Sequence, residues 1–323
     1  MTVASRVLDR AAWQQRERLH HERADALTAA HRERASRGEK HPVWDFLFTY
    51  YSYAPSRLKR WHAGAGVVLR DASERLDWRW YSPAGSHSSV VADASRFAAE
   101  KPGLAQLIER MLRRTAARPG QFGCFGLHEW AMVYRDDEHR HSAPLRLGQA
   151  GTDAVVEAHE LRCTHYDAFR FFTPAAAGRN RLLDRAGQPE HEQPGCLHAG
   201  MDVYKWAIKL GPLVPGELLL DAFELAAAIR LLDMEAAPYD LSEWGVEPVA
   251  IETPEGKAEY VRRQRAFAGR GNVLRRRILA AWLAGEAADL DAQDAGSQSA
   301  HGAQTALDAA RSSRSAMTRS AAS

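Results

Sequence analysis

Residues 216–234 read GELLLDAFELAAAIRLLDM, and this stretch decides the fold class of the chain. It is rich in Leu and Ala, which favour helices, and its interior contains neither glycine nor proline. Apolar residues would face nearly every side of such a helix, so we expect a long helix that is buried. Further helical patterns cover residues 7–37, 43–53, 90–100, 104–117, 201–210 and 253–284. The sequence therefore predicts a mainly α fold.

Two parts of the chain differ from this helical pattern. The apolar runs 66–69 and 78–81 flank a polar turn, which indicates a small β-hairpin. From residue 285 onward the composition changes to Ala, Ser, Gln, Asp and Gly, which buries too little apolar surface to offset the entropy of ordering. We therefore expect one helical core domain over residues 1–284 and a disordered low-complexity tail over residues 285–323.

The composition of the 323 residues excludes several classes of protein. The three cysteines, Cys124, Cys163 and Cys196, form no CxxC pair, which argues against a zinc knuckle or a disulfide framework. A net charge of +2 does not mark a dedicated nucleic-acid-binding protein. No apolar run approaches the roughly 18 residues of a membrane span, and the N-terminal segment lacks the features of a signal peptide. We expect a cytoplasmic protein without a membrane partner.

Residues 41–64, HPVWDFLFTYYSYAPSRLKRWHAG, concentrate aromatic rings, two histidines and a basic run. On a helix, His41 and Asp45 share one face and Trp44 and Tyr51 the neighbouring one. The rings either belong to the core or line a pocket for a flat or cationic ring. In the second interpretation, the residues that bind the ligand are His41, Trp44, Tyr50, Tyr51, Trp61 and His62, and those that hold phosphate are Arg57, Lys59 and Arg60.

Two further polar groups occur around positions 128 and 165. His128 follows a glycine-rich stretch, where bare backbone can approach a ligand closely. His165 and Asp167 belong to HELRCTHYDAFRFF, residues 159–172. The two histidines of this segment would point to different faces of a helix, so it does not match the HExxH zinc pattern. Structural roles remain open for both groups: a polar turn at His128, and an ion pair between Asp167 and Arg170.

Carboxylates at helical spacing form the remaining candidates. His198 and Asp202 are four residues apart, with Lys205 nearby, and can present two metal ligands or an acid/base pair. A partly exposed helix start explains the same pattern. Asp221 and Glu224 share a face of the apolar stretch 216–234. Buried carboxylates are rare unless they are paired or used, so these two are either catalytic or bound to a basic residue of another helix.

The chain also resembles a known group of proteins. The resemblance lies in the strings EKHPVWDFLFTYYSY, RLKRWHAG, HAGMDVYKWAIKL, LLLDAFELAAAIRLLDMEAAPYDL and IETPEGKAEYVRRQRAF. These strings are similar to those of actinobacterial chains identified as 3-methyladenine DNA glycosylases, over about residues 8–283. The resemblance implies a base-excision repair enzyme that acts on DNA without a cofactor. Only half of a helix-hairpin-helix motif is present, since Leu218 stands where that motif has its second glycine.

Removal of an alkylated base requires an aromatic pocket for the extruded base and a carboxylate near the sugar. Segment 41–62 offers the rings. The candidate catalytic carboxylates are Asp45, Asp167, Asp202 and Asp221. Further candidates for contact with the ligand are His128, His165, His198 and Lys205.

Two other classes of function stay open. The first is a helical oxidoreductase of the non-haem iron type, because such folds hold iron or manganese through histidines and carboxylates from several helices. Its candidate ligands are His128, His165, His198, Asp202 and Glu224. The second is a non-catalytic helical protein that binds a flat aromatic ligand.

Overall fold

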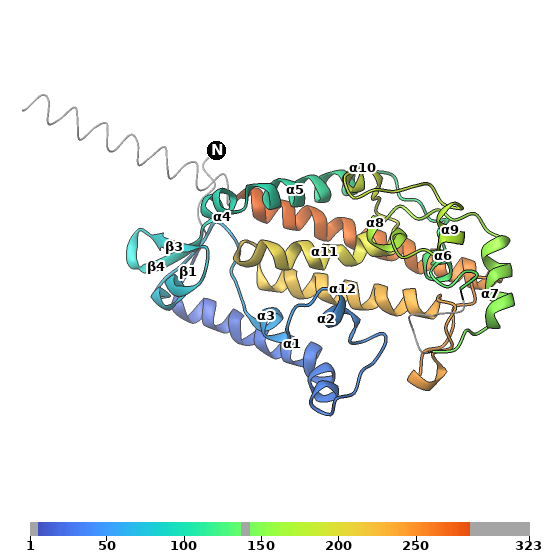
Figure 1. Ribbon diagram of the computed structural model, residues 1–323. Helices are drawn as coiled ribbons and strands as arrows, with labels where there is room; N and C mark the ends of the chain where they lie inside the picture. Colours follow the sequence, from blue (N-terminus) through green and yellow to red (C-terminus); the bar gives the residue numbers. More distant parts are fainter. Residues whose placement is uncertain (1–5, 137–142, 285–323) are drawn as a thin grey trace, which may run out of the picture.

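The computed structural model describes residues 6–136 and 143–284, and Figure 1 shows a mainly α architecture, as predicted. The tail predicted over residues 285–323 lies outside these ranges. A small sheet lies at one end of a set of long helices, and several short helices gather at the other end (Figure 1).

The long helices form the body of the molecule. They are α5 (Pro102–Ala117), α11 (Leu197–Leu210), α12 (Gly216–Glu235) and a last helix over residues 254–284, and they lie side by side in Figure 1. The short turn η2 (Gly211–Leu213) connects α11 to α12. Gly200 allows their close contact, because a Cβ at this position would lie 2.6 Å from Cδ1 of Ile229.

Helix α12 is buried along most of its length, as the opening stretch predicts. Leu220, Leu225, Ile229 and Leu232 are fully buried in the main core. Burial of a Leu or Ile side chain contributes about 1.5–3 kcal/mol. The helix is therefore the centre around which the other elements pack.

Helix α1 (Arg10–Ser36) packs against the side of α12 that faces away from α11 (Figure 1). It begins three residues later than predicted, because Arg6–Leu8 forms strand β1. Asp9 caps the helix, and its carboxylate accepts the N–H of Ala12 at 2.8 Å.

The sheet is larger than the predicted hairpin and is paired differently. Its order is β1, β2 (Val67–Leu69), β4 (Ser86–Ala92) and β3 (Tyr81–Ala84), with β1 parallel to β2 and the other pairs antiparallel. The hairpin therefore joins β3 to β4, across Gly85 at φ 77°. Strand β4 also removes the first part of the helix expected over 90–100, so α4 covers only Ala94–Glu100.

The remaining elements are short. The helix expected over residues 43–53 is reduced to α2 (Phe46–Tyr50), and segment 159–172 is mainly loop with α8 (Tyr166–Phe169) inside it. The other short elements are α3 (Pro55–Lys59), η1 (Ser73–Asp77), α6 (Leu127–Ala131), α7 (Gly148–Glu157), α9 (Pro174–Ala177), α10 (Gln188–His191) and η3 (Ser242–Trp244).

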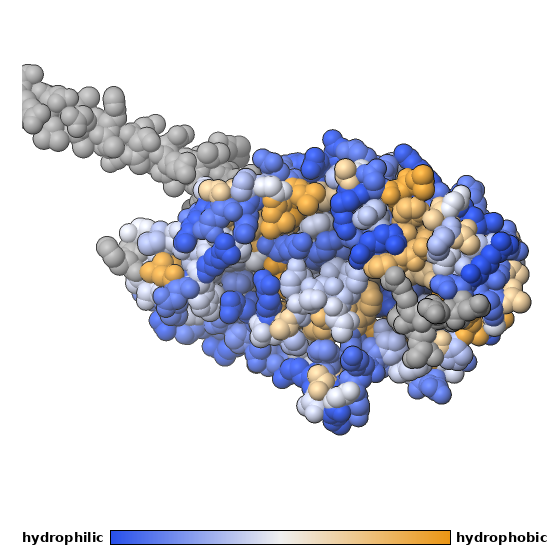
Figure 2. All heavy atoms as spheres, in the orientation of Figure 1, coloured by the Kyte–Doolittle hydropathy of each residue, from blue (hydrophilic) through white to orange (hydrophobic). Residues whose placement is uncertain are grey.

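The outer surface is mixed. Hydrophilic residues cover most of the face seen in Figure 2, and hydrophobic residues appear there as separate patches. Among the described residues, no helix is both long enough and apolar enough to cross a membrane.

Candidate functional site

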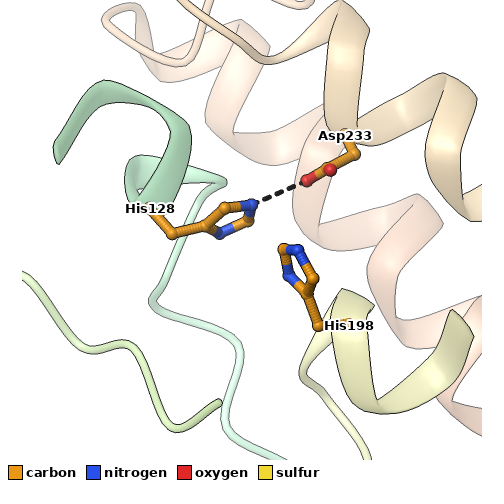
Figure 3. A group of neighbouring side chains, drawn as sticks. All are labelled: His128, His198 and Asp233. Atoms are coloured by element: carbon orange, nitrogen blue, oxygen red, sulfur yellow. Dashed lines mark hydrogen bonds and ion pairs between the residues drawn. The ribbon is translucent and has the colours of Figure 1, made fainter. Parts of the chain in front are cut away.

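Three buried side chains from three helices converge where α6 covers the bundle (Figure 3). His128 belongs to α6, His198 to the first turn of α11 and Asp233 to the last turn of α12. One nitrogen or oxygen of each lies within 4.8 Å of the other two. We call these three residues the His/Asp centre.

A strained turn places His128 in this position. Phe125 and Gly126 both have positive φ, 48° and 73°, directly before α6. A non-glycine residue such as Phe125 rarely adopts this conformation. A Cβ on Gly126 would lie 3.3 Å from Cβ of Ala236, so glycine permits close contact with the end of α12. The glycine-rich stretch thus brings His128 to Asp233.

An ion pair connects two members of the centre. Nε2 of His128 and Oδ1 of Asp233 lie 2.8 Å apart, and Arg230 donates to Oδ2 of Asp233 at 2.9 Å. Burial opposes both charges, but the opposite charge of the partner outweighs it, so the pKa of His128 is raised and that of Asp233 is lowered. Because ionised Asp233 can only accept, His128 donates to it.

His198 differs from its two neighbours. Its ring lies 4.5 Å from the ring of His128 and 5.2 Å from that of His165, measured between centroids. Within the described part of the chain, no hydrogen bond of this ring is found, although the residue is only 8 % exposed. Burial, followed by the charge of His128, lowers its pKa. A neutral imidazole therefore points towards His128 and Asp233 with an available lone pair (Figure 3).

A second group of ionisable residues includes His165, which stacks on His198. One ligand atom each of His165, Asp167 and Asp202 lies within 4.8 Å of the others. The ammonium of Lys205 contacts the carboxylate of Asp202 directly and lies 3.8 Å from that of Asp167. We call His165, Asp167, Asp202 and Lys205 the Lys205 cluster. The ammonium of Lys205 already occupies the place of a cation there, so the cluster is a poorer metal site than the His/Asp centre.

The contacts of the Lys205 cluster explain its charge states. Glu192 lies 3.2 Å from Nε2 of His165. Burial would lower the pKa of His165, but Glu192 and Asp202 raise it to about 9. Burial likewise opposes the charge of Lys205, but Asp202 raises its pKa, and the pKa of Asp202 is lowered in turn. In the Lys205 cluster, the positive charges of His165 and Lys205 are therefore compensated by the carboxylates around them.

Two tyrosines of the aromatic segment, residues 41–64, lie close to the Lys205 cluster. The hydroxyl of Tyr51 donates to Oδ1 of Asp202 at 2.8 Å. Tyr50 packs edge-on against Tyr51, and burial raises its pKa to about 12. The structure thus brings two predicted ring residues to a predicted carboxylate.

The first residues of the aromatic segment line a cavity of about 580 Å³ instead. His41, Asp45 and Phe46 lie in its wall, with Met234 opposite. Asp45 accepts hydrogen bonds from Arg34, at 2.5 and 3.1 Å, and lies 2.9 Å from His31. Burial would raise its pKa, but Arg34 and His31 lower it to about 2. Trp44 points away and is 43 % exposed.

Trp61 and His62 lie elsewhere. Trp61 is fully buried in the main core and donates to Glu217 at 3.4 Å. Nδ1 of His62 lies 3.0 Å from the hydroxyl of Tyr81, and burial lowers the pKa of His62 to about 3. Neither residue lines the cavity at His41.

His62 instead lines a groove of about 200 Å³, which is bounded by α3, by residues 78–80 before β3 and by the region where α11 meets α12. Arg57 lies over the ring of Tyr53 at 5.1 Å, and Arg60 over that of Trp78 at 5.0 Å. In the ranges that the structure describes, neither guanidinium has a carboxylate within ion-pair distance. Lys59 differs, since it binds Asp25 at 2.7 Å. The basic groove comprises Arg57, Arg60, His62, Trp78, Arg79 and Trp80.

Asp221 and Glu224 lie on the outer face of α12. Both bind Arg23 of α1 at 2.9 Å, and Asp221 also binds Arg277 at 3.1 Å. Their side chains are 32 % and 39 % exposed. Of the two interpretations of these carboxylates, the structure shows pairing with basic residues of other helices. Glu224 is therefore separate from the histidines with which the metal hypothesis grouped it.

Sequence reasoning missed Asp233 as a site residue. Its signal is Arg230, the one basic residue of the stretch 216–234, which lies three residues before Asp233 and pairs with it. Glu129 completes this buried set, because Arg230 also lies 3.2 Å from its carboxylate. Charged residues are rarely buried unless they are paired or used, so a buried pair of opposite charge marks such a site.

Comparisons with known proteins identify no relative. No family model matches the chain, and neither a curated protein nor a solved structure matches it. The function is therefore inferred from the geometry of the His/Asp centre, the Lys205 cluster and the basic groove.

Proposed function

We propose that the protein is a metal-dependent oxidoreductase of the non-haem iron type and that the His/Asp centre holds the metal. The observation that carries this proposal is the convergence of two histidines and one aspartate in the core, with the His198 ring lacking a hydrogen-bond partner. Two histidines and one carboxylate are the donor set of non-haem iron sites, where the remaining coordination positions accept substrate.

Each residue has a distinct role in this proposal. Asp233 supplies the negative charge and His198 a neutral imidazole nitrogen. His128 supplies the third donor after it gives up the proton that it shares with Asp233. Arg230 holds the second oxygen of Asp233 and so orients the carboxylate. A bound iron would supply one-electron chemistry.

The surrounding scaffold supports a fixed donor geometry. His198 and Asp233 come from α11 and α12, which pack closely against each other, and His128 comes from the short helix α6. Donors on helices are positioned better than donors on loops. His165 stacks on His198 with ring planes 27° apart. His165 is itself held by an ion pair with Asp202 of the Lys205 cluster. The ring of His198 is therefore restrained without a hydrogen bond of its own.

Metal analysis tests this proposal. The purified chain should bind about one iron or manganese per chain after anaerobic reconstitution, and His198→Ala should remove that uptake. His159→Ala is the matched control, because among residues 6–136 and 143–284 the ring of His159 hydrogen-bonds only to the carbonyl oxygen of Val155, at 2.6 Å. Circular dichroism checks that both variants fold. Wild-type protein without iron or manganese, or a His198→Ala variant with unchanged uptake, would contradict the proposal.

The basic groove supports a second candidate, the DNA glycosylase that the sequence resemblance implies. Arg57 lies over the ring of Tyr53 and Arg60 over that of Trp78, and neither guanidinium has an ion-pair partner among the described residues. Positive charge attracts the nucleic-acid backbone, and aromatic faces stack on bases. This combination favours single-stranded or locally opened DNA over a small neutral ligand.

The glycosylase activity needs a carboxylate near the sugar, and four aspartates are candidates for it. Each binds a basic side chain: Asp45 binds Arg34, Asp167 binds Arg185, Asp202 binds Lys205 and Asp221 binds Arg23. None of them lines the basic groove as described. Release of 3-methyladenine from methylated DNA tests the activity, with Asp→Asn at each position. Absence of base release by the wild type would exclude it.

A further inference from the structure

Another cavity has a volume of about 390 Å³ and shares no lining residue with the His/Asp centre. Four arginines form much of its wall: Arg118, Arg162, Arg179 and Arg181. We call it the arginine pocket. Its volume falls within the range of small-molecule sites, about 300–1,000 Å³.

The positive charge of the arginine pocket is only partly compensated. Glu160 binds Arg162 at 2.6 Å, and Glu190 binds Arg118 at 3.4 Å but also contacts Arg114 outside the pocket. These are the only two carboxylates in its described lining. Four guanidinium groups therefore face two carboxylates, which leaves an excess of positive charge for an anion.

Two of the arginines, Arg179 and Arg181, have no carboxylate within ion-pair distance among the described residues. Arg179 donates to the carbonyl oxygens of Val156 and Glu157, both at 3.2 Å, which fixes its position without neutralising its charge. Arg181 has no carboxylate within ion-pair distance among residues 6–136 and 143–284. A carboxylate or phosphate group can accept two parallel hydrogen bonds from such a guanidinium.

The rest of the lining is apolar or neutral. Pro119, Leu161 and Leu183 provide an apolar wall, and Leu161 and Leu183 are buried. An occupant would therefore combine an anionic group with a small apolar body. A bare inorganic anion would leave the apolar wall in contact with water.

Two residues of the arginine pocket are close in the chain to His165, whose ring contacts the His/Asp centre. Cys163 and Thr164 line the pocket and directly precede His165, which stacks on His198. Burial raises the pKa of Cys163, and the charges of nearby groups, including Asp233, add to this effect. The chain thus connects the pocket wall at Cys163 and Thr164 directly to the ring that contacts His198.

We propose that the arginine pocket binds a small organic anion, a carboxylate or phosphate attached to an apolar body, as the substrate of the His/Asp centre; this rests on the proposed function. The guanidinium of Arg181 contacts the anionic group, and the apolar body lies towards Cys163. For the reacting part of the substrate to reach the His/Asp centre, the side chains of Cys163 and Thr164 would have to move.

Binding to metal-free protein tests the pocket by itself. Hexanoate and hexyl phosphate should bind in calorimetric titrations, whereas hexanamide and hexylamine, which share the same chain, should bind about tenfold more weakly or not at all. Arg181→Ala should weaken anion binding about tenfold, and Arg181→Lys should restore part of it. Arg113→Ala is the control, because Arg113 is paired with Glu109 on α5 and does not line the pocket.

Equal binding of the neutral, cationic and anionic probes, or unchanged binding by Arg181→Ala, would overturn the proposal. Metal uptake, measured separately, distinguishes this failure from failure of the proposed function. If the protein binds hexanoate but no metal, the proposed function fails while the anion site remains. In cobalt-loaded protein, hexanoate should shift the visible spectrum, and an unchanged spectrum at saturating hexanoate would overturn the link between pocket and centre.

Discussion

The His/Asp centre and the basic groove both collect charged and aromatic residues, but they handle charge in opposite ways. Asp233 of the centre is fully buried and forms ion pairs with His128 and with the buried Arg230. In the groove, Arg57 and Arg60 lie against rings and have no carboxylate within ion-pair distance in the described ranges. Buried charges must be compensated, whereas charges in contact with water need no partner. Substitutions should therefore affect stability in the centre and binding in the groove.

The largest expected effect is on stability in the centre. Asp233→Asn removes the charge that compensates His128 and Arg230, so it should lower the free energy of unfolding by about 3–5 kcal/mol. Urea denaturation followed by circular dichroism measures this change. Asp221→Asn, on the exposed face of the same helix, is the control and should cost about 1 kcal/mol or less. Equal losses for both variants would remove the distinction between the two faces.

A comparable effect is expected for the two tryptophans of the aromatic segment. Trp61→Ala should cost about 3–5 kcal/mol because the ring is fully buried. Trp44→Ala should change stability by about 0.5 kcal/mol at most, since that ring is 43 % exposed. Thermal denaturation of both variants checks this pair. A stable Trp61→Ala protein with impaired ligand binding would instead assign Trp61 to a binding site.

An intermediate effect concerns acid stability at Asp45. Its pKa is lowered from about 4 in the unfolded chain to about 2, so its contribution is complete above pH 4 and is lost as the pH falls through 2. The contribution is about 2 kcal/mol. Asp45→Asn should flatten the dependence of unfolding free energy on pH between 4 and 2. Asp25→Asn, which alters an exposed pair with Lys59, should change it much less.

The smallest effect on stability is expected in the groove. Arg57→Ala and Arg60→Ala should each change the free energy of unfolding by about 0.5 kcal/mol at most. If the groove binds DNA, each variant should reduce the salt dependence of binding by about one phosphate contact. Fluorescence anisotropy with single-stranded DNA at several salt concentrations measures this slope. Unchanged slopes for both variants would remove the groove from nucleic-acid binding.

Local sequence signals predicted the long helices well. Residues 216–234 matched α12 within one residue, because Leu and Ala without internal glycine or proline specify a helix by themselves. Segment 43–53 gave only a helix of five residues, Phe46–Tyr50. There the ring-rich pattern reflects packing against α11 and α12, which the local sequence does not encode.

The candidate site was only partly predictable for the same reason. His128 and His198 were identified as chemically interesting, but their partner Asp233 lies 105 residues from His128 in the chain. Apart from Arg230, three residues before Asp233, nothing local separates Asp233 from Asp221, although one faces the core and the other faces α1. Sequence spacing gives residues that share a helix face, whereas contacts between helices require the fold.

Cobalt(II) substitution of the His/Asp centre decides between a metal site and a structural network. Reconstituted wild-type protein should show visible absorption bands at about one cobalt per chain. His198→Ala should lose these bands, and His159→Ala should retain them. No bands in the wild type, or identical bands in His198→Ala, would show that His128, His198 and Asp233 form a structural network without a metal.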